Sequence, residues 1–301
     1  MPRHVSYVPL RWADMDAFGH VNNVVYLRYL QEARVDMLFV HAPEHGAEQL
    51  ARGVVVRRHE IGYRAPLRFR PQPVRVETWV TEVRAASFGL GYEVLDIASD
   101  GSRTVYAVAA SVLVPYDLEE ECIRRIAPRE REVLGSFLET DGPVPGRMGY
   151  GATRSPSEER ARVRVRPSRL RHVYECAVRF DDLDSYGHVN NVTFAEYLQE
   201  ARVDFAHRYL ADALETHEGS VVAHQALDYL RPVSFRIDPL RVVVWVTRIG
   251  TSSFEVAYEV CDDDAVHVRA TGALVAFDVA EHRPRPLTEA ERAALTKFLE
   301  P

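Results

Sequence analysis

The sequence is short of cysteine and of long apolar runs. The longest apolar runs in its 301 residues fall far short of the ~18 residues that a membrane-spanning helix needs, so we expect no membrane span. The amino terminus, MPRHVSYVPLRW, lacks the apolar core of a secretory signal peptide. The 3 cysteines, Cys122, Cys176 and Cys261, are too few and too scattered for a disulfide framework or a Cys-x-x-Cys metal site. These absences predict a protein of the reducing cytoplasm.

The sequence also lacks a basic excess. It contains 37 Lys and Arg against 44 Asp and Glu, a formal net charge of −7. Proteins that bind nucleic-acid phosphates normally carry a positive excess, so we expect no nucleic-acid partner. With 47% hydrophobic and 27% charged residues, the composition is that of an ordinary globular protein. The length suits two domains of about 150 residues each.

The sequence contains an internal repeat, two copies of one domain. Residues 11–37 read RWADMDAFGHVNNVVYLRYLQEARVDM, and residues 179–205 read RFDDLDSYGHVNNVTFAEYLQEARVDF; they agree at 17 of 27 positions without a gap. After a two-residue deletion the match continues to the end of each copy. Residues 140–169, between the copies, are rich in Gly, Pro, Ser and Arg and indicate a linker. The predicted domains are therefore residues 1–139 and 170–301.

Each copy shows the same order of predicted elements. A short strand leads into an Asp-rich segment, and a helix begins near Asn22 or Asn190, because Asn is a favoured N-cap. In copy one, apolar residues at helical spacing run from Tyr26 to Val40. Short helices at about 128–139 and 287–299 close the copies. Strand-like runs lie between, in copy one at Val54–Tyr63, Val74–Val83, Phe88–Asp96 and Thr104–Tyr116. The pattern predicts an α+β fold with an antiparallel sheet wrapped around one long helix.

The strongest chemical signal is a carboxylate followed by a glycine turn and a helix start. Backbone N–H groups at a helix start can stabilise an oxyanion, and a nearby carboxylate can attack a carbonyl or activate water. These parts suit hydrolysis of an acyl group. The alternative interpretation is that the Asp only caps the turn, the Asn only caps the helix, and the His only holds the loop. The residues are Asp16, Gly19, His20, Asn22 and Asn23 in copy one, and Asp184, Gly187, His188, Asn190 and Asn191 in copy two.

The two copies differ on the strand after the helix. Copy one reads Arg57-Arg58-His59-Glu60 where copy two reads Ala223-His224-Gln225-Ala226. Strand alternation places Arg58 and Glu60 on one face, with Arg57 and His59 on the other. If one face lines a pocket, the two sites differ in charge. On the helix, Arg34 and Arg202 are expected in salt bridges or at an interface rather than in catalysis.

The motif Asp-x-Asp-x-x-Gly-His-Val-Asn-Asn-x-x-Tyr, followed by Gln-Glu-Ala-Arg, resembles the hotdog-fold acyl-CoA thioesterases of the 4-hydroxybenzoyl-CoA thioesterase type. The resemblance covers both copies and implies two tandem hotdog domains that form a pseudo-dimer. It implies that Asp16 and Asp184 are the catalytic carboxylates. It also implies an oxyanion donor among the backbone N–H groups near Asn23 and Asn191. Each site would take its Asp from one copy and part of its wall from the other.

The expected function is hydrolysis of an acyl-CoA thioester. Coenzyme A is then part of the substrate, and no separate cofactor or metal is expected. Arg57 and Arg58 could bind the coenzyme's phosphates or could simply be solvated. An acyl-ACP thioesterase and a non-catalytic acyl-CoA binding module stay open as alternatives, whereas a hotdog dehydratase would need a His–acid pair that the two copies do not share. The acyl group, the number of working sites and a homodimer of pseudo-dimers also stay open.

Overall fold

The computed structural model describes residues 3–42, 47–48, 50, 53–117, 119–120, 122–140, 170–214 and 218–300. Residues 141–169 of the predicted linker therefore lie outside the described residues. Copy one contains β1 (His4–Val8), η1 (Trp12–Asp14), α1 (Asn23–Val35), η2 (Asp36–His41), β2 (Val54–Tyr63), β3 (Val74–Val83), β4 (Phe88–Ile97), β5 (Arg103–Asp117), β6 (Cys122–Ile123) and α4 (Pro128–Ser136).

Copy two repeats this order, and it confirms the predicted α+β class. Its elements are β7 (His172–Cys176), η3 (Phe180–Asp182), α5 (Thr193–Tyr209), η4 (Ala211–Ala213), β8 (Glu218–Tyr229), β9 (Leu240–Ile249), β10 (Ser253–Cys261), β11 (Val266–Asp278), β12 (Arg283–Pro284) and α6 (Glu289–Thr296).

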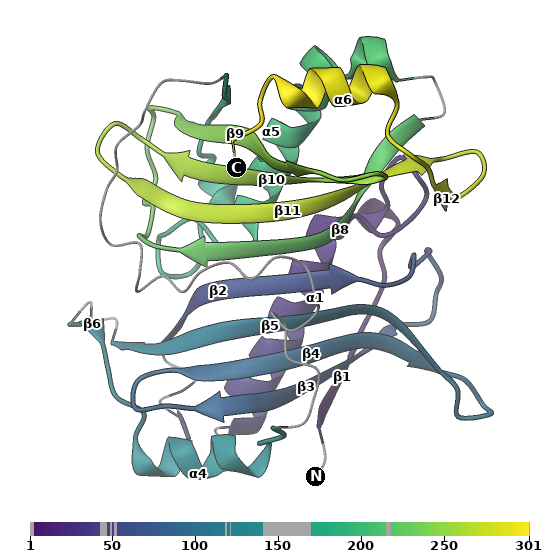
Figure 1. Ribbon diagram of the computed structural model, residues 1–301. Helices are drawn as coiled ribbons and strands as arrows, with labels where there is room; N and C mark the ends of the chain where they lie inside the picture. Colours follow the sequence, from purple (N-terminus) through teal and green to yellow (C-terminus); the bar gives the residue numbers. More distant parts are fainter. Residues whose placement is uncertain are drawn as a thin grey trace.

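One antiparallel sheet runs through both copies, and the long helices α1 and α5 lie behind it in Figure 1. The strand order is β1-β3-β4-β5-β2-β8-β11-β10-β9-β7, so β2 and β8 join the two halves. The short helices α4 and α6 cover opposite ends of the molecule (Figure 1). The half-sheets are thus continuous, as expected of a pseudo-dimer.

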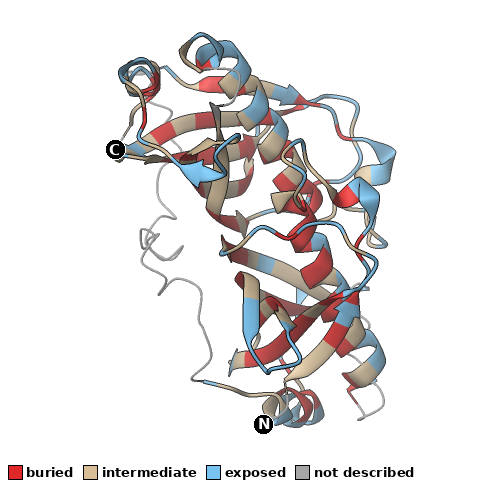
Figure 2. Cartoon of the chain, turned by 90° about the vertical axis from the view of Figure 1, so that its right-hand side faces the viewer, coloured by how far each residue is buried: buried red, intermediate tan, exposed pale blue. Residues whose placement is uncertain are grey.

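The core lies between the sheet and the two long helices. Leu27, Leu30 and Ala33 of α1 are 0% exposed, because their three-residue spacing keeps these side chains close to one helix face. In β9, buried residues alternate with half-buried ones, which turns one strand face toward the helices. Seen from the side, the buried residues gather along these facing surfaces (Figure 2). Fully burying each Leu contributes about 1.5–3 kcal/mol, so this layer holds each helix on its half-sheet.

The joint between β2 and β8 has two different faces. On one face Arg58 bonds Asp228 at 2.5 Å and Glu60 at 3.2 Å, and the Nε2 of His224 lies 3.1 Å from Glu60. On the other face His59 is 0% exposed, and its Nε2 lies 2.9 Å from the side-chain nitrogen of Asn191, just before α5. The predicted alternation of Arg58 and Glu60 is therefore confirmed. A β-bulge between Val56 and Arg58 shifts the register at Arg57.

The end of the first long helix differs from its prediction. α1 ends at Val35, and the next six residues form the π-helical segment η2. Its wider i→i+5 turn changes the phase of every later side chain. Val40, predicted on the buried stripe, is therefore 56% exposed, whereas Leu38 is 1% exposed. In copy two, α5 stays α-helical to Tyr209, so the two copies differ here. Within the described residues, no helix is long and apolar enough to cross a membrane.

Candidate active site between the two copies

Each motif carboxylate caps a tight turn with one of its oxygens. The Oδ1 of Asp184 accepts hydrogen bonds from the backbone N–H of Tyr186 at 2.8 Å and of His188 at 3.4 Å. Gly187 follows with a φ of +75°, a backbone conformation that favours glycine. The Oδ1 of Asp16 does the same in copy one. The turn-cap interpretation thus holds for one oxygen, but Oδ2 of neither carboxylate has a hydrogen-bond partner among the described residues.

The first Asp of each motif is structural. The Oδ2 of Asp14 accepts hydrogen bonds from the hydroxyl of Tyr29 at 2.6 Å and from the backbone N–H of Arg11 at 2.8 Å. Asp182 accepts from Tyr197 in the same way, also at 2.6 Å. Burial, together with the neighbouring Asp14, raises the pKa of Tyr29, so its hydroxyl keeps its proton. These bonds tie the loop to the central helix and leave the second Asp available for chemistry.

The capping side chain pairs with only part of the backbone N–H groups at the start of the helix that follows. The side chain of Asn190 caps it by accepting from the N–H of Val192 at 3.1 Å, and Asn22 accepts from Val24 in copy one. The carbonyl of Asn191 accepts a hydrogen bond from the Tyr229 hydroxyl at 2.8 Å. In the described part of the chain, the N–H of Asn191 has no acceptor, and neither has that of Asn23. Such a donor can bind an oxyanion.

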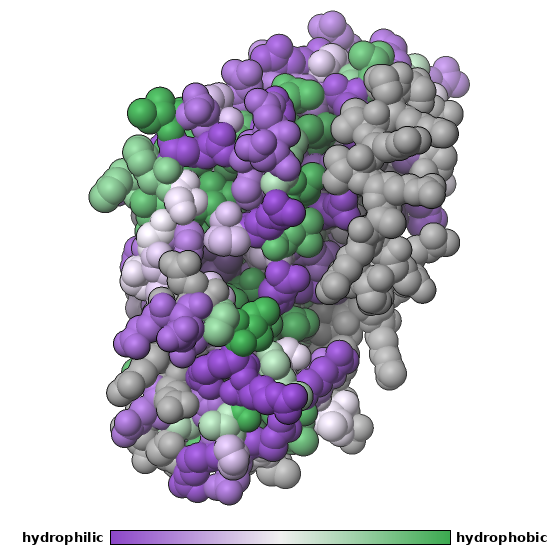
Figure 3. All heavy atoms as spheres, turned by 90° about the vertical axis from the view of Figure 1, so that its left-hand side faces the viewer, coloured by the Kyte–Doolittle hydropathy of each residue, from purple (hydrophilic) through white to green (hydrophobic). Residues whose placement is uncertain are grey.

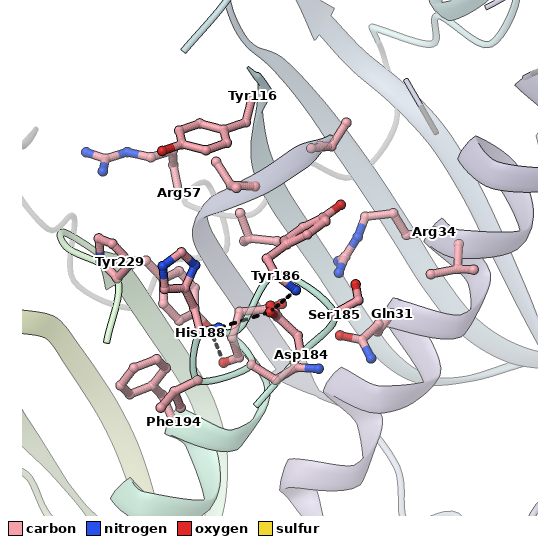
Figure 4. Close-up of a pocket in the computed structure, with 18 of the residues that line it drawn as sticks. Gln31, Arg34, Arg57, Tyr116, Asp184, Ser185, Tyr186, His188, Phe194 and Tyr229 are labelled. Carbon is pink, nitrogen blue, oxygen red and sulfur yellow. Dashed lines mark hydrogen bonds between the residues drawn. The ribbon is translucent and has the colours of Figure 1, made fainter. Parts of the chain in front are cut away.

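A cavity of about 460 Å³ opens in front of Asp184, between the two copies. In Figure 4 Tyr229, Phe194 and His188 of copy two lie on one side of Asp184, and Gln31 and Arg34 of α1 lie on the other. The expectation of a composite wall is therefore met at this site. The volume falls within the roughly 300–1,000 Å³ typical of small-molecule sites.

The wall of the cavity is apolar along one part and cationic along another. Val35, Phe39 and Ile123 line it and are 38%, 42% and 56% exposed, so apolar surface reaches its mouth. Figure 3 views the side on which β2 begins and β8 ends, and apolar side chains reach that surface between polar ones. Arg57 and Arg231 also line the cavity and are exposed. Neither forms an ion pair with a described residue.

The other predicted phosphate ligand lies elsewhere. Arg58 does not line the cavity, because its guanidinium is bound to Asp228 and Glu60 on the opposite face of the sheet. The structure therefore brings Arg57, but not Arg58, to the Asp184 site.

The Asp16 loop packs against the other end of the same strand pair. Phe18 lies beside Gly219 of β8, so this site is also approached by both copies. His20 is half-buried, and loss of solvation lowers its pKa. Its Nε2 has no hydrogen-bond partner in the described ranges, and its ring centroid lies 6.3 Å from that of His282. Among the described residues the His20 side chain makes no hydrogen bond to the loop, so the loop-holding interpretation gains no support at this site.

Sequence reasoning gave no role in the Asp184 site to several residues that the structure places there. Tyr229 bonds the carbonyl of Asn191, and its copy-one counterpart Tyr63 bonds the carbonyl of Asn23 at 2.7 Å. The alignment of these two tyrosines between the copies was the one sequence signal for this shared role. Arg34, expected at an interface, lies in the cavity wall with 8% exposure. His59 contacts Asn191 across the joint, which no spacing in the sequence indicates.

Comparison with known proteins agrees with this architecture. The family model of the Thioesterase-like superfamily matches residues 10–137 and 178–295, once on each copy. The chain belongs to the Thioesterase-like superfamily. The two matched regions cover most of the chain and confirm a tandem hotdog arrangement. Membership supports thioester hydrolysis as the general activity.

Two solved structures share the fold along nearly the whole chain. The 12:0-ACP thioesterase from Umbellularia californica has a TM-score of 0.66 and 17% identity, covering 93% of this chain and 94% of that one. An acyl-ACP thioesterase from Bacteroides thetaiotaomicron VPI-5482 has a TM-score of 0.59 and 15% identity, with 90% and 96% covered. The uncharacterized protein YsmA of Bacillus subtilis (strain 168) is 35% identical over 82 residues, 27% of this chain. The chain spans about half the length of that curated relative, 55%.

Proposed function

We propose that the protein hydrolyses acyl-CoA thioesters to a carboxylic acid and free coenzyme A. The observation that carries the proposal is that Asp184 and Asn191 line one cavity, while the Oδ2 of the first and the N–H of the second have no hydrogen-bond partner among the described residues. A carboxylate and an oxyanion donor are the two parts that thioester hydrolysis needs.

In this proposal the N–H of Asn191 binds the thioester carbonyl oxygen and stabilises the negative charge that develops on it. Asp184 then acts by one of two routes. As nucleophile, its Oδ2 bonds to the carbonyl carbon, the C–S bond breaks, and water later cleaves the mixed anhydride. As general base, it takes a proton from a water whose oxygen attacks the same carbon. In both routes water supplies the hydroxyl of the acid and the proton on the sulfur of coenzyme A.

The two parts of the cavity wall support coenzyme A as the carrier. Arg57 and Arg231 offer guanidinium groups that bind phosphate oxygens well, and the apolar surface at Val35 and Phe39 suits an acyl chain. Both copies retain the motif Asp, which favours CoA over acyl carrier protein. Carrier-protein thioesters are the second candidate, since two solved structures that share the fold are acyl-ACP thioesterases.

The cysteines support neither a thiol mechanism nor an oxidising compartment. All three are free, and burial raises the pKa of the Cys176 thiol to about 12, which keeps it protonated. We therefore place the activity in the reducing cytoplasm. A homodimer of pseudo-dimers stays a prediction.

The test is release of free thiol from a panel of acyl-CoAs, from short to long alkyl and aryl, with matched carrier-protein thioesters alongside. The Asp16→Asn/Asp184→Asn double variant should lose turnover by at least about a hundredfold while its Tm stays near that of the parent. Full activity in the double variant would contradict the assigned carboxylates. Tight acyl-CoA binding without turnover by the parent would favour the binding module instead.

A further inference from the structure

A hydrogen-bonded chain links the interior of copy one to the helix start of copy two. His59 on β2 is 0% exposed, and its Nδ1 lies 2.7 Å from the Oγ of Ser111 on β5. Its Nε2 lies 2.9 Å from the side-chain nitrogen of Asn191. Because an amide nitrogen is a donor, Nε2 accepts this bond and the Nδ1–H donates to Ser111. Burial lowers the pKa of His59 well below its ordinary value, so the ring is neutral, as this pattern requires.

Asn191 is thereby held at two points from two directions. The Tyr229 hydroxyl, from copy two, bonds its backbone carbonyl, and His59, from copy one, bonds its side chain. The backbone N–H of the same residue is the proposed oxyanion donor. Both contacts therefore limit the directions in which that N–H can point.

Within the part of the chain that the structure describes, the Asp16 site has no equivalent chain of hydrogen bonds. Gln225 and Gly272 are cross-strand partners in copy two, as His59 and Ser111 are in copy one. Gln225 is 1% exposed, and both polar atoms of its side chain have no hydrogen-bond partner among the described residues. The side-chain nitrogen of Asn23 has none there either, and its oxygen lies 3.5 Å from the Nη2 of Arg202. Among the described residues, the one short hydrogen bond that holds Asn23 is that of Tyr63 to its carbonyl, at 2.7 Å.

We propose that His59 is a positioning residue for the oxyanion donor of the Asp184 site, and that this site turns over faster than the Asp16 site. The inference rests on the proposed function and deepens it. The N–H of Asn191 is already oriented, so it needs no further ordering as the transition state forms. The N–H of Asn23 is held at one point and must be ordered as the transition state forms. The contribution therefore falls on kcat rather than on substrate binding.

The two copies differ at these positions, so exchanging their residues tests this idea. Asp16→Asn isolates the Asp184 site, and Asp184→Asn isolates the Asp16 site. On the first background, His59→Gln with Ser111→Gly installs the residues of copy two. On the second, Gln225→His with Gly272→Ser installs the residues of copy one. A Cβ at Gly272 meets its nearest atoms at 3.5 Å or more, in ordinary contact, so the serine fits.

We expect the Asp16→Asn protein to keep most of the parent rate and the Asp184→Asn protein to lose most of it. The His59→Gln/Ser111→Gly pair should lower kcat of the isolated Asp184 site about tenfold and change KM by less than about twofold. The reverse pair should raise kcat of the isolated Asp16 site. A structural role alone predicts no such gain.

The matched control is His172→Gln, another buried histidine, on β7 at the outer edge of the sheet. It should change Tm without changing kcat. Hydrogen–deuterium exchange tests the positioning without any substrate: His59→Gln should speed exchange over residues 189–195, whereas residues 21–27 should exchange as in the parent.

Equal rates from the two isolated sites, or an unchanged kcat after His59→Gln/Ser111→Gly, would overturn the inference. Uniformly faster exchange in both helix starts would overturn it too, because it would indicate a general loss of stability. If no thioester is hydrolysed by the parent, the proposed function fails, and the inferred rate difference fails with it; the exchange result then still shows whether His59 holds the helix start.

Discussion

The hydroxyl of Tyr229 donates a hydrogen bond over 2.8 Å to the backbone carbonyl of Asn191, a residue that lines the Asp184 cavity. Tyr63 and Asn23 make the same contact in the other copy at 2.7 Å. Each tyrosine therefore fixes the peptide that follows the proposed oxyanion donor, and each does so from its own copy.

Removing this hydroxyl should slow the chemistry of one site only. Tyr229→Phe leaves a carbonyl without its donor, which costs about 1–3 kcal/mol of stability and frees the helix start. On the Asp16→Asn background we expect kcat to fall about tenfold, measured as thiol release. Tyr63→Phe is the matched variant and should act only on the Asp184→Asn background. Equal effects of both variants on both backgrounds would show that the tyrosines act through stability alone.

Arg57 and Arg231, the exposed arginines of the cavity wall, should govern recognition of the nucleotide end of coenzyme A. Arg57→Ala and Arg231→Ala should each raise KM for an acyl-CoA about three- to tenfold, because one charge-assisted contact to a phosphate is lost. The same variants should leave KM for the acyl-pantetheine thioester, which lacks the nucleotide, unchanged. Arg58→Ala, on the other face of the sheet, should instead lower Tm. A KM for acyl-CoA that stays at the parent value in the Arg57→Ala/Arg231→Ala protein would place the phosphates elsewhere.

The apolar mouth should limit the length of the acyl chain. Val35 lines the cavity on α1, and Val35→Phe fills part of that space without entering the core, since the residue is 38% exposed. On the Asp16→Asn background, the ratio of kcat/KM for long over short acyl-CoAs should fall about tenfold. The matched variant is Val203→Phe at the corresponding position of α5, which should not change the ratio on this background. An unchanged ratio of kcat/KM for long over short acyl-CoAs in Val35→Phe would mean that the acyl chain binds elsewhere.

His59 should make the fold less stable in mild acid. Burial holds its folded-state pKa well below the ordinary value of 6.5, so the unfolded chain takes up a proton that the folded chain does not. Its contribution to stability is therefore fully present above that ordinary value and is lost as the pH falls below it. Between about pH 7.5 and about pH 5.5 the parent should lose about 1.4 kcal/mol more unfolding free energy than His59→Gln.

Urea unfolding at the two pH values measures this difference. His20 and His172, whose pKa values burial also lowers, are present in both proteins, so their contributions cancel in the comparison. Parallel losses in the parent and in His59→Gln would mean that the ring of His59 is protonated in the folded protein.

The repeat made most of the fold predictable. The strands, the central helices and the Asn caps follow from local patterns that occur twice, and the structure places the predicted strands within a residue or so of their expected ends. The π-helical turn after Val35 was not predictable, because its residues keep an apolar pattern that also fits an α-helix.

The candidate site was predictable only in part. Asp184, Asn190 and Asn191 lie close together along the chain, so one motif contains them. His59 and Arg34 reach that motif from the other copy, and their places depend on the pairing register of β2 with β8. Periodicity assigns a residue to a face of a strand, but it does not say which residue lies opposite it. The bulge at Arg57 arises in the pairing of β2 with β5, and the sequence pattern does not indicate it either.

The joint between β2 and β8 also changes what a single substitution can do. In a pair of identical subunits every replacement appears in both active sites, so neither can be altered alone. Here one covalent chain supplies both halves, and a replacement on β2 alters the wall in front of Asp184 while the wall in front of Asp16 keeps its own residue. Copy one has Arg57 where copy two has Ala223, and His59 where copy two has Gln225, so these positions vary independently. The fused chain can thus carry two specialised sites, each tuned by residues that belong to the other repeat.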